Sequence, residues 1–250
     1  MAAPQPQAVT FDQGRHHRAK IGYLLLATEQ TIPDDVYKLA PKGVGLHFTR
    51  VAIPDSITVE TLQAQSGLLA EAAALLLPDG SLDVVCYACT SGSLVIGEQR
   101  VHRELKKGAP SAKTTSLITG VIRALRQVGA RRLVVGTPYV DPINERERRY
   151  LEEAGFEVLH IEGLNLEHDS DMVRVCPDYL EQFAVRLDRT DADALFLSCG
   201  ALRSLEIVER VERRIGKPVI VSNQAMIWDT FRLAGILDRL EGYGRLLRDH

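Results

Sequence analysis

The sequence predicts an α/β protein of two pseudo-symmetric Rossmann-like lobes, each with a parallel four-stranded sheet, and an active site in the cleft between them. Three observations support this prediction. Short apolar runs alternate with longer segments of helical periodicity, which is typical of parallel sheets. The same order of segments recurs about 110 residues later, and each half carries a cysteine at the end of its third strand-like run, Cys89 and Cys199.

The first lobe is expected to begin near Lys20, after a loose leader over residues 1–18 that mixes Pro, Gln, His and Arg without periodicity. Two segments, 58–77 and 97–107, have apolar residues at helical spacing and predict helices. The β-rich runs that predict strands of this lobe are 21–27, 45–53, 83–88 and 112–116.

The second lobe repeats this order with predicted strands at 132–137, 156–161, 192–198 and 218–222. Gly129, Gly155 and Gly216 each follow a helical run and are expected to end that helix in the left-handed conformation. No linker rich in Pro, Gly or Ser divides the halves, so the lobes should pack closely. The predicted helices are 119–127, 145–154, 177–189, 202–215 and 225–233.

Composition excludes several classes of protein. The chain has 45% apolar residues, 25% charged residues, a net charge of −3 and a pI near 6.2. Its basic residues are interleaved with acidic ones, so we expect no nucleic-acid partner. It has no apolar run long enough for a membrane span and no signal peptide, which predicts a cytoplasmic protein without a membrane partner. In that compartment the four cysteines should be free thiols.

The turn at residues 89–93, Cys-Thr-Ser-Gly-Ser, is the strongest candidate for chemistry. Its small residues allow close approach, and its N–H and hydroxyl groups can hold a carboxylate or an oxyanion. A helix start also lowers a thiol pKa, so Cys89 could be a base, nucleophile or acid. The alternative is a buried cysteine at a strand end, but the repetition at Cys199 favours function. Cys86 and Cys176 are expected in the core.

Tyr139 follows the first strand of the second lobe and should face the same cleft. Its hydroxyl could bind a substrate carboxylate, although an aromatic residue there can also simply pack. The histidines have no metal-ligand spacing, and a zinc site would need a second ligand pair beside Cys86 and Cys89. Dinucleotide and P-loop motifs are missing from the sequence. We therefore expect neither a metal nor a nucleotide.

Five motifs together resemble the Asp/Glu racemase superfamily, and within it the branch of maleate cis-trans isomerases, arylmalonate decarboxylases and ectoine-utilisation A-type proteins. The resemblance covers nearly the whole chain after Lys20. It implies no cofactor, a homo-oligomer and a C-terminal segment that returns to the first lobe, so that the lobes are 19–117 with 224–250, and 118–223. The motifs lie at residues 89–93, 137–146, 198–200, 216–224 and 242–246.

The resemblance implies that Cys89 and Cys199 are the catalytic pair. Arylmalonate decarboxylases carry glycine where Cys89 stands, so keeping both thiols favours isomerisation or racemisation. In the isomerases a thiolate adds to an alkene carbon, whereas in the racemases two thiols exchange an α-proton. The substrate-binding residues implied by the same positions are Thr90, Ser91, Tyr139, Gly200 and Ala201.

Two positions depart from the maleate isomerase pattern, where asparagines bind carboxylate. Gln30 lies at or near one of them, and Asp169 replaces the other. An aspartate repels a second substrate carboxylate but pairs with an ammonium or amidinium group. These departures disfavour maleate and favour an amino acid or an ectoine-type acid.

The sequence thus predicts a cofactor-independent isomerase or racemase that acts on a small carboxylate through Cys89 and Cys199. One alternative is a decarboxylase that uses only Cys199 as proton donor. The other is a non-catalytic protein that binds small carboxylates.

Overall fold

The computed structural model describes residues 8–250, and its framework is two sheets of four strands. The strand orders are β2-β1-β3-β4 and β6-β5-β7-β8, and all neighbouring strands are parallel. All eight predicted strands are confirmed to within a few residues. Their bounds are β1 (Ala19–Leu26), β2 (Val44–Val51), β3 (Val84–Tyr87), β4 (Lys113–Ser116), β5 (Arg132–Thr137), β6 (Glu157–Gly163), β7 (Ala194–Leu197) and β8 (Val219–Val221).

The helices of the first half differ in part from the prediction. The segment predicted as one helix over 58–77 is broken into three short helices, and a helix that the periodicity did not predict follows β1. That helix, α1, has a proline in its first turn followed by two acidic residues, a common helix-start pattern. The bounds are α1 (Ile32–Leu39), α2 (Val59–Ala64), η1 (Gln65–Gly67), α3 (Leu69–Ala74), α4 (Thr90–Ile96), α5 (Glu98–Gly108) and α6 (Leu117–Gln127).

The second half follows the prediction more closely. Gly129, Gly155 and Gly216 have φ of 73°, 94° and 73°, as expected for glycines that end helices. The predicted helix 202–215 begins with a separate 3₁₀ turn, and short helices form at 169–172 and 245–249. The bounds are α7 (Asp141–Glu153), α8 (Asp169–Met172), α9 (Pro177–Leu187), η2 (Ser204–Glu206), α10 (Val208–Ile215), α11 (Ser222–Leu233) and α12 (Arg245–Asp249).

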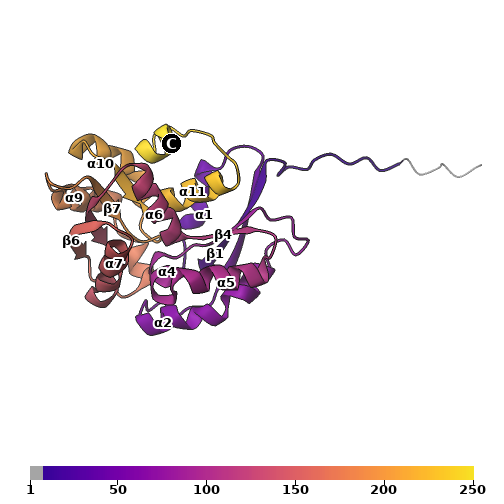
Figure 1. The fold of residues 1–250 in the computed structure, drawn as a ribbon, viewed down its shortest axis with the longest axis horizontal. Helices are drawn as coiled ribbons and strands as arrows, with labels where there is room; N and C mark the ends of the chain where they lie inside the picture. Colours follow the sequence, from indigo (N-terminus) through magenta and orange to yellow (C-terminus); the bar gives the residue numbers. More distant parts are fainter. Residues whose placement is uncertain (1–7) are drawn as a thin grey trace, which may run out of the picture.

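The two halves pack against each other through α6 and α11, which lie side by side in Figure 1. Their close approach requires a glycine, because a Cβ at Gly120 would lie 3.0 Å from the Ala225 carbonyl oxygen. Both apolar clusters of the core draw residues from both sheets, so the interior is continuous across the junction. No helix within residues 8–250 is long and apolar enough to cross a membrane.

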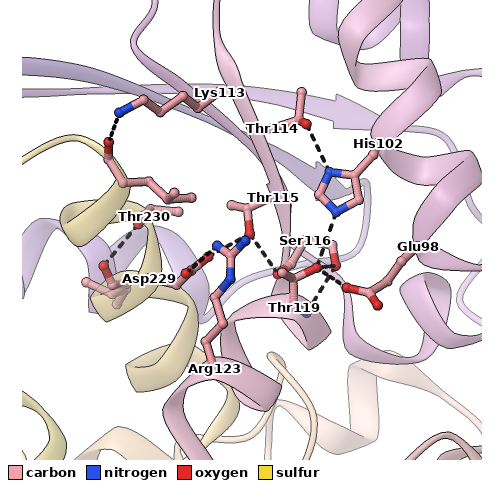
Figure 2. A network of polar contacts seen from close by, with 12 residues as sticks. Glu98, His102, Lys113, Thr114, Thr115, Ser116, Thr119, Arg123, Asp229 and Thr230 are labelled. Atoms are coloured by element: carbon pink, nitrogen blue, oxygen red, sulfur yellow. Dashed lines mark hydrogen bonds and ion pairs between the residues drawn. The ribbon is translucent and has the colours of Figure 1, made fainter. Parts of the chain in front are cut away.

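A polar network supports this junction (Figure 2). The carboxylate of Asp229 on α11 is 2% exposed and accepts hydrogen bonds from Thr115 (2.6 Å) and Arg123 (2.8 Å). Glu98 on α5 accepts hydrogen bonds from the hydroxyls of Thr119 and Tyr150, which belong to α6 and α7. These bonds satisfy the buried carboxylate of Asp229 and connect helices of both halves.

Residues 8–18 of the predicted leader form neither helix nor strand, and its residues 1–7 lie outside the described part of the chain. Within this segment the His16 ring packs edge-on against that of His47, with centroids 5.5 Å apart, and the Arg18 N–H donates to the Gly43 carbonyl oxygen (3.0 Å).

Candidate active site

A small cavity lies at the carboxyl ends of the two central strands of each sheet. It encloses about 300 Å³, its opening to solvent included, so only a small molecule can enter it. In open α/β sheets this end is where ligands bind. The residues that line the cavity are Leu26, Glu29, Ile57, Ala88, Cys89, Thr90 and Ser91 from the first half, and Tyr139, Asp169, Met172, Cys199, Gly200 and Ala201 from the second.

Cys89 follows β3 and is the N-cap residue of α4, with ordinary extended backbone angles (φ −145°, ψ 120°). Its Sγ accepts a hydrogen bond from the Gly92 N–H (3.2 Å) and lies 3.7 Å from the Ser91 hydroxyl oxygen. The first N–H groups of a helix have no partner within that helix. Those of Thr90 and Ser91 therefore can bind a substrate oxygen beside the thiol.

Cys199 follows β7 at the equivalent place, but its backbone differs. Its φ is +93°, a region that residues other than glycine rarely adopt. The Sγ accepts a hydrogen bond from the Ala201 N–H (3.4 Å), and the chain continues into the 3₁₀ turn η2 rather than directly into a helix. Non-glycine residues with such backbone angles cluster at active sites, where the surrounding structure holds them.

Burial raises the pKa of both thiols, so the expected lowering at a helix start is wrong. Cys89 and Cys199 are each 6% exposed, and the loss of water disfavours the thiolate. This raises the pKa of Cys89 to about 11 and raises the pKa of Cys199 well above its usual range. Asp169 adds to both shifts, whereas the Tyr139 hydroxyl beside Cys199 lowers the pKa of that thiol. Burial therefore favours the protonated form of both thiols.

Tyr139 lies in the turn after β5, 2% exposed, and lines the cavity beside Cys199. Thr137 and Asn144 hold this turn. The Tyr139 N–H donates to the Thr137 hydroxyl oxygen (3.1 Å), and the Asn144 side chain donates to the Tyr139 carbonyl oxygen (3.1 Å). Burial raises the pKa of the Tyr139 phenol well above its usual range, so it is a hydrogen-bond donor at neutral pH.

Of the two residues that depart from the maleate isomerase pattern, one lines the cavity and the other does not. Asp169 is 3% exposed, lines the cavity and accepts a hydrogen bond from the Thr28 hydroxyl (2.5 Å). Gln30 is exposed and does not line the cavity; its neighbour Glu29, 4% exposed, does. The residue of this turn that faces the cavity is therefore Glu29 rather than the predicted Gln30, because the tight turn after β1 directs Glu29 inward.

The other predicted binding residues surround the two thiols. Thr90, Ser91, Gly200 and Ala201 all line the cavity. The Thr90 hydroxyl also lies 3.1 Å from that of Ser222, which joins the first cysteine turn to α11.

The two remaining cysteines differ in burial. Cys86 is buried in β3 as expected, whereas Cys176 is exposed, because it precedes α9 at the surface rather than within a strand. All four cysteines are free.

The charges around the cavity are all acidic. None of the lining residues found among residues 8–250 is Lys, Arg or His, and two are carboxylic acids, Glu29 and Asp169. No group of three or more His, Cys, Asp or Glu in that part of the chain is arranged to hold a metal ion. The site thus combines two buried thiols, a phenol and two buried carboxyl groups.

Comparison with known proteins connects this arrangement to one family. A family model described as arylmalonate decarboxylase matches residues 22–247. The arylmalonate decarboxylase of Bordetella bronchiseptica is 30% identical over 236 residues, covering 90% of this chain and 95% of that protein. The maleate isomerase of Nocardia farcinica is 27% identical over 241 residues, covering 92% and 95%.

A solved structure agrees with these matches. A Nocardia farcinica maleate cis-trans isomerase mutant with a covalently bound succinylcysteine intermediate superimposes with a TM-score of 0.84 at 25% identity, covering 93% of this chain and 99% of that one. The predicted α/β fold and the predicted family are confirmed. This chain belongs to the arylmalonate decarboxylase family of enzymes, which includes the maleate isomerases.

Proposed function

We propose that this enzyme is a cofactor-independent isomerase or racemase that acts on a small carboxylate through two cysteines. The observation that carries the proposal is that Cys89 and Cys199, at the ends of equivalent strands β3 and β7, line one cavity. A covalent cysteine intermediate in the related Nocardia farcinica isomerase supports a thiol as the reacting group.

The proposed chemistry needs one thiolate and one thiol. In a racemisation, the thiolate takes the α-proton from one face, and the opposite thiol donates its own proton to the other face. In an alkene isomerisation, the thiolate adds to one alkene carbon, the carbon–carbon bond rotates, and the same C–S bond then breaks to release the thiolate. Both routes place negative charge on a carbon next to a carboxylate.

The turn N–H groups and Tyr139 are positioned to stabilise that charge. The Thr90 and Ser91 N–H groups and the Tyr139 hydroxyl are donors around the thiols, and donors aimed at a developing oxyanion supply a large share of catalysis. Because burial disfavours both thiolates, the thiol that acts as base or nucleophile must first give its proton to water or to the carboxylate of the incoming substrate.

The acidic lining favours a substrate with a cationic nitrogen. Burial raises the pKa of Asp169, so the cavity does not favour extra negative charge. A substrate ammonium or amidinium would pair with this carboxylate and also favour a nearby thiolate. We therefore propose an amino acid or an ectoine-type acid rather than maleate.

A decarboxylase is the second candidate, favoured by the 30% identity to arylmalonate decarboxylase. In that reaction carbon dioxide leaves first, and Cys199 then donates its proton to the remaining enediolate. The raised pKa of Cys199 keeps the thiol protonated for this step. In this alternative Cys89 takes no part.

Proton NMR in D₂O separates the candidates. Wild type, Cys89→Ala, Cys199→Ala and the exposed control Cys176→Ala are each incubated with maleate, alanine, ectoine and phenylmalonate. Loss of α-proton exchange or isomerisation in both active-site variants, but not in Cys176→Ala, supports the two-cysteine enzyme. Carbon dioxide release that needs only Cys199 supports the decarboxylase. Turnover that survives both substitutions contradicts both candidates.

A further inference from the structure

Two carboxyl groups in the cavity each keep one oxygen without a protein partner. In Glu29, Oε1 accepts hydrogen bonds from the N–H groups of Thr31 (2.5 Å) and Ile32 (2.9 Å). In Asp169, Oδ2 accepts the Thr28 hydroxyl proton (2.5 Å). No hydrogen bond from residues 8–250 reaches Glu29 Oε2 or Asp169 Oδ1. Neither oxygen is among the fully enclosed side-chain atoms that lack a partner, and both residues line the cavity, so these oxygens are open to it and a ligand with N–H donors could reach them.

One segment holds both acids in place. Thr28 precedes Glu29 directly and binds Asp169, so the turn after β1 connects the two carboxyl groups across the halves of the molecule. A basic side chain contacts this turn but forms no ion pair with either acid. Arg50 instead donates to the carbonyl oxygens of Leu26 (2.9 Å), Ala27 (3.2 Å) and Glu29 (2.8 Å), which fixes the turn.

The pair lies beside the reacting groups. Glu29 and Asp169 line the cavity together with both thiols, and each acid disfavours the Cys199 thiolate electrostatically. Burial, with a smaller contribution from the negative charges of Asp169 and Asp35, raises the pKa of Glu29 to about 7. A single positive charge between them would relieve this repulsion.

We propose that Glu29 and Asp169 together form a subsite that binds the protonated amine or amidinium of the substrate through two N–H donors. A quaternary ammonium has the charge but no N–H to give to the two open oxygens, and a dicarboxylate is repelled. The substrate class is therefore a small acid with a primary or secondary ammonium, or an amidinium, close to the reacting carbon. This inference rests on the proposed function for the location of that carbon.

Calorimetric titration with matched probes tests the subsite. The probes are alanine and proline, their fully N-methylated quaternary derivatives, ectoine and maleate. Wild type is expected to bind at least one of alanine, proline and ectoine, and to bind any amino acid that it accepts at least about tenfold more tightly than its quaternary derivative or maleate, because a charge-assisted hydrogen bond is lost in each case. The absence of binding by all three nitrogen acids, or equal binding of the quaternary forms, overturns the inference.

Substitution of Glu29 tests whether this residue causes the preference for acids with an N–H donor. Glu29→Gln keeps the shape of the side chain but removes its charge. It should weaken binding of the amino acid by about tenfold or more, and so reduce the preference of the protein for the amino acid over maleate. The control is Glu167→Gln, an exposed carboxylate two residues from Asp169, which should change nothing. An unchanged affinity in Glu29→Gln overturns the inference.

The outcomes also separate this inference from the proposed function. Glu29-dependent binding of an amino acid without proton exchange or isomerisation would leave the subsite intact and contradict the proposed activity. Cysteine-dependent turnover of maleate that is insensitive to Glu29→Gln would support a two-cysteine enzyme and overturn the subsite.

Discussion

The turns that carry Cys89 and Cys199 occupy equivalent places in two sheets of the same topology, yet they differ in backbone and surroundings. Cys89 caps α4 with an ordinary extended backbone, and its thiol accepts a hydrogen bond from the Gly92 N–H. Cys199 has a φ of +93°, and both Asp169 and Glu29 raise the pKa of its thiol. The two halves thus share a fold, but the charged groups around their cysteines differ.

This difference assigns unequal roles to the two thiols. The Gly92 N–H supports a thiolate at Cys89, which Asp169 opposes, whereas a thiolate at Cys199 is opposed by both Asp169 and Glu29. We infer that Cys89 is the thiolate that attacks carbon or hydrogen, and that Cys199 is the proton donor. A duplicated fold thus supplies opposed groups, while neighbours that are not repeated distinguish the acid from the base.

The largest expected effect comes from filling the space behind the first cysteine. A Cβ at Gly92 would lie 2.2 Å from the Tyr87 hydroxyl oxygen and 3.0 Å from Cys89 Sγ, and the Tyr87 hydroxyl is fixed by Gln65 (2.7 Å). Gly92→Ala should therefore cost about 3 kcal/mol of stability and about 100-fold in activity. Denaturant unfolding and steady-state kinetics measure the two effects.

The matched change in the second turn is Gly200→Ala. Its Cβ would meet the end of the Ile32 side chain at 2.8 Å, which can move more easily than a fixed phenol. The loss of stability should be about 1 kcal/mol. Equal losses for the two variants would contradict the difference in packing between the turns.

The next largest effect is expected from removing the hydroxyls of the tyrosines beside the two thiols. Tyr139 lines the cavity, whereas Tyr87 lies behind Cys89 and does not. Tyr139→Phe should lower kcat about 100-fold, because it removes a donor to the developing charge, with a smaller change in KM. Tyr87→Phe should lower it less than tenfold. A larger loss in Tyr87→Phe would reverse the assignment.

A buried acid behind the second turn predicts a pH effect on stability. Glu147 is fully buried, accepts a hydrogen bond from the Ser198 hydroxyl (2.6 Å), and burial raises its pKa to about 7. The folded chain therefore holds this proton more tightly than the unfolded chain, whose value is near 4.5. Stability should fall as the pH rises from about 4.5 to about 7, by an amount on the order of 3 kcal/mol from this group.

Glu147→Gln removes that ionisation. Melting temperatures recorded between pH 4.5 and 8 should decline less in this variant than in wild type. The residue before Cys89 is Ala88, so the first turn has no hydroxyl in the place of Ser198 to bind such an acid. An identical decline in both proteins would show that Glu147 is not held protonated.

The smallest effect is the difference in stability between glycine and alanine at each cysteine position. Its sign should be opposite at the two positions, because their backbone angles differ. At Cys199, with positive φ, glycine should be about 1 kcal/mol more stable than alanine, because an L side chain is strained there. At Cys89, with φ −145°, glycine should be about 0.5–1 kcal/mol less stable than alanine. Thermal unfolding of the four variants measures both differences. The same sign at both positions would contradict the comparison.

The sequence was sufficient to predict the strands and the positions of both cysteines. Each strand is a local apolar run. Parallel topology brings the ends of β1 and β3 together in one sheet and those of β5 and β7 together in the other, and all four ends lie at one cavity. The helix α1 was missed although Thr31, Ile32 and Pro33 carry a helix-start pattern, because its eight residues give little periodicity.

Features that depend on the exact path of a turn or on residues far away in the chain were predicted less well. A shift of one residue in the turn after β1 decides whether Glu29 or Gln30 faces the cavity. The direction of the thiol pKa shifts depends on burial and on Asp169, which is 80 residues from Cys89 in the chain. A helix start alone suggested the opposite sign, because local patterns contain no information on desolvation.

The most direct test of the unequal thiols is the rate of alkylation of each one as a function of pH. Iodoacetamide labelling of the Cys176→Ala protein, followed by mass spectrometry of the separate peptides, reports Cys89 and Cys199 independently. The account predicts that Cys89 is labelled faster and titrates at lower pH than Cys199. Equal titration of the two thiols, or a lower pKa for Cys199, would contradict it.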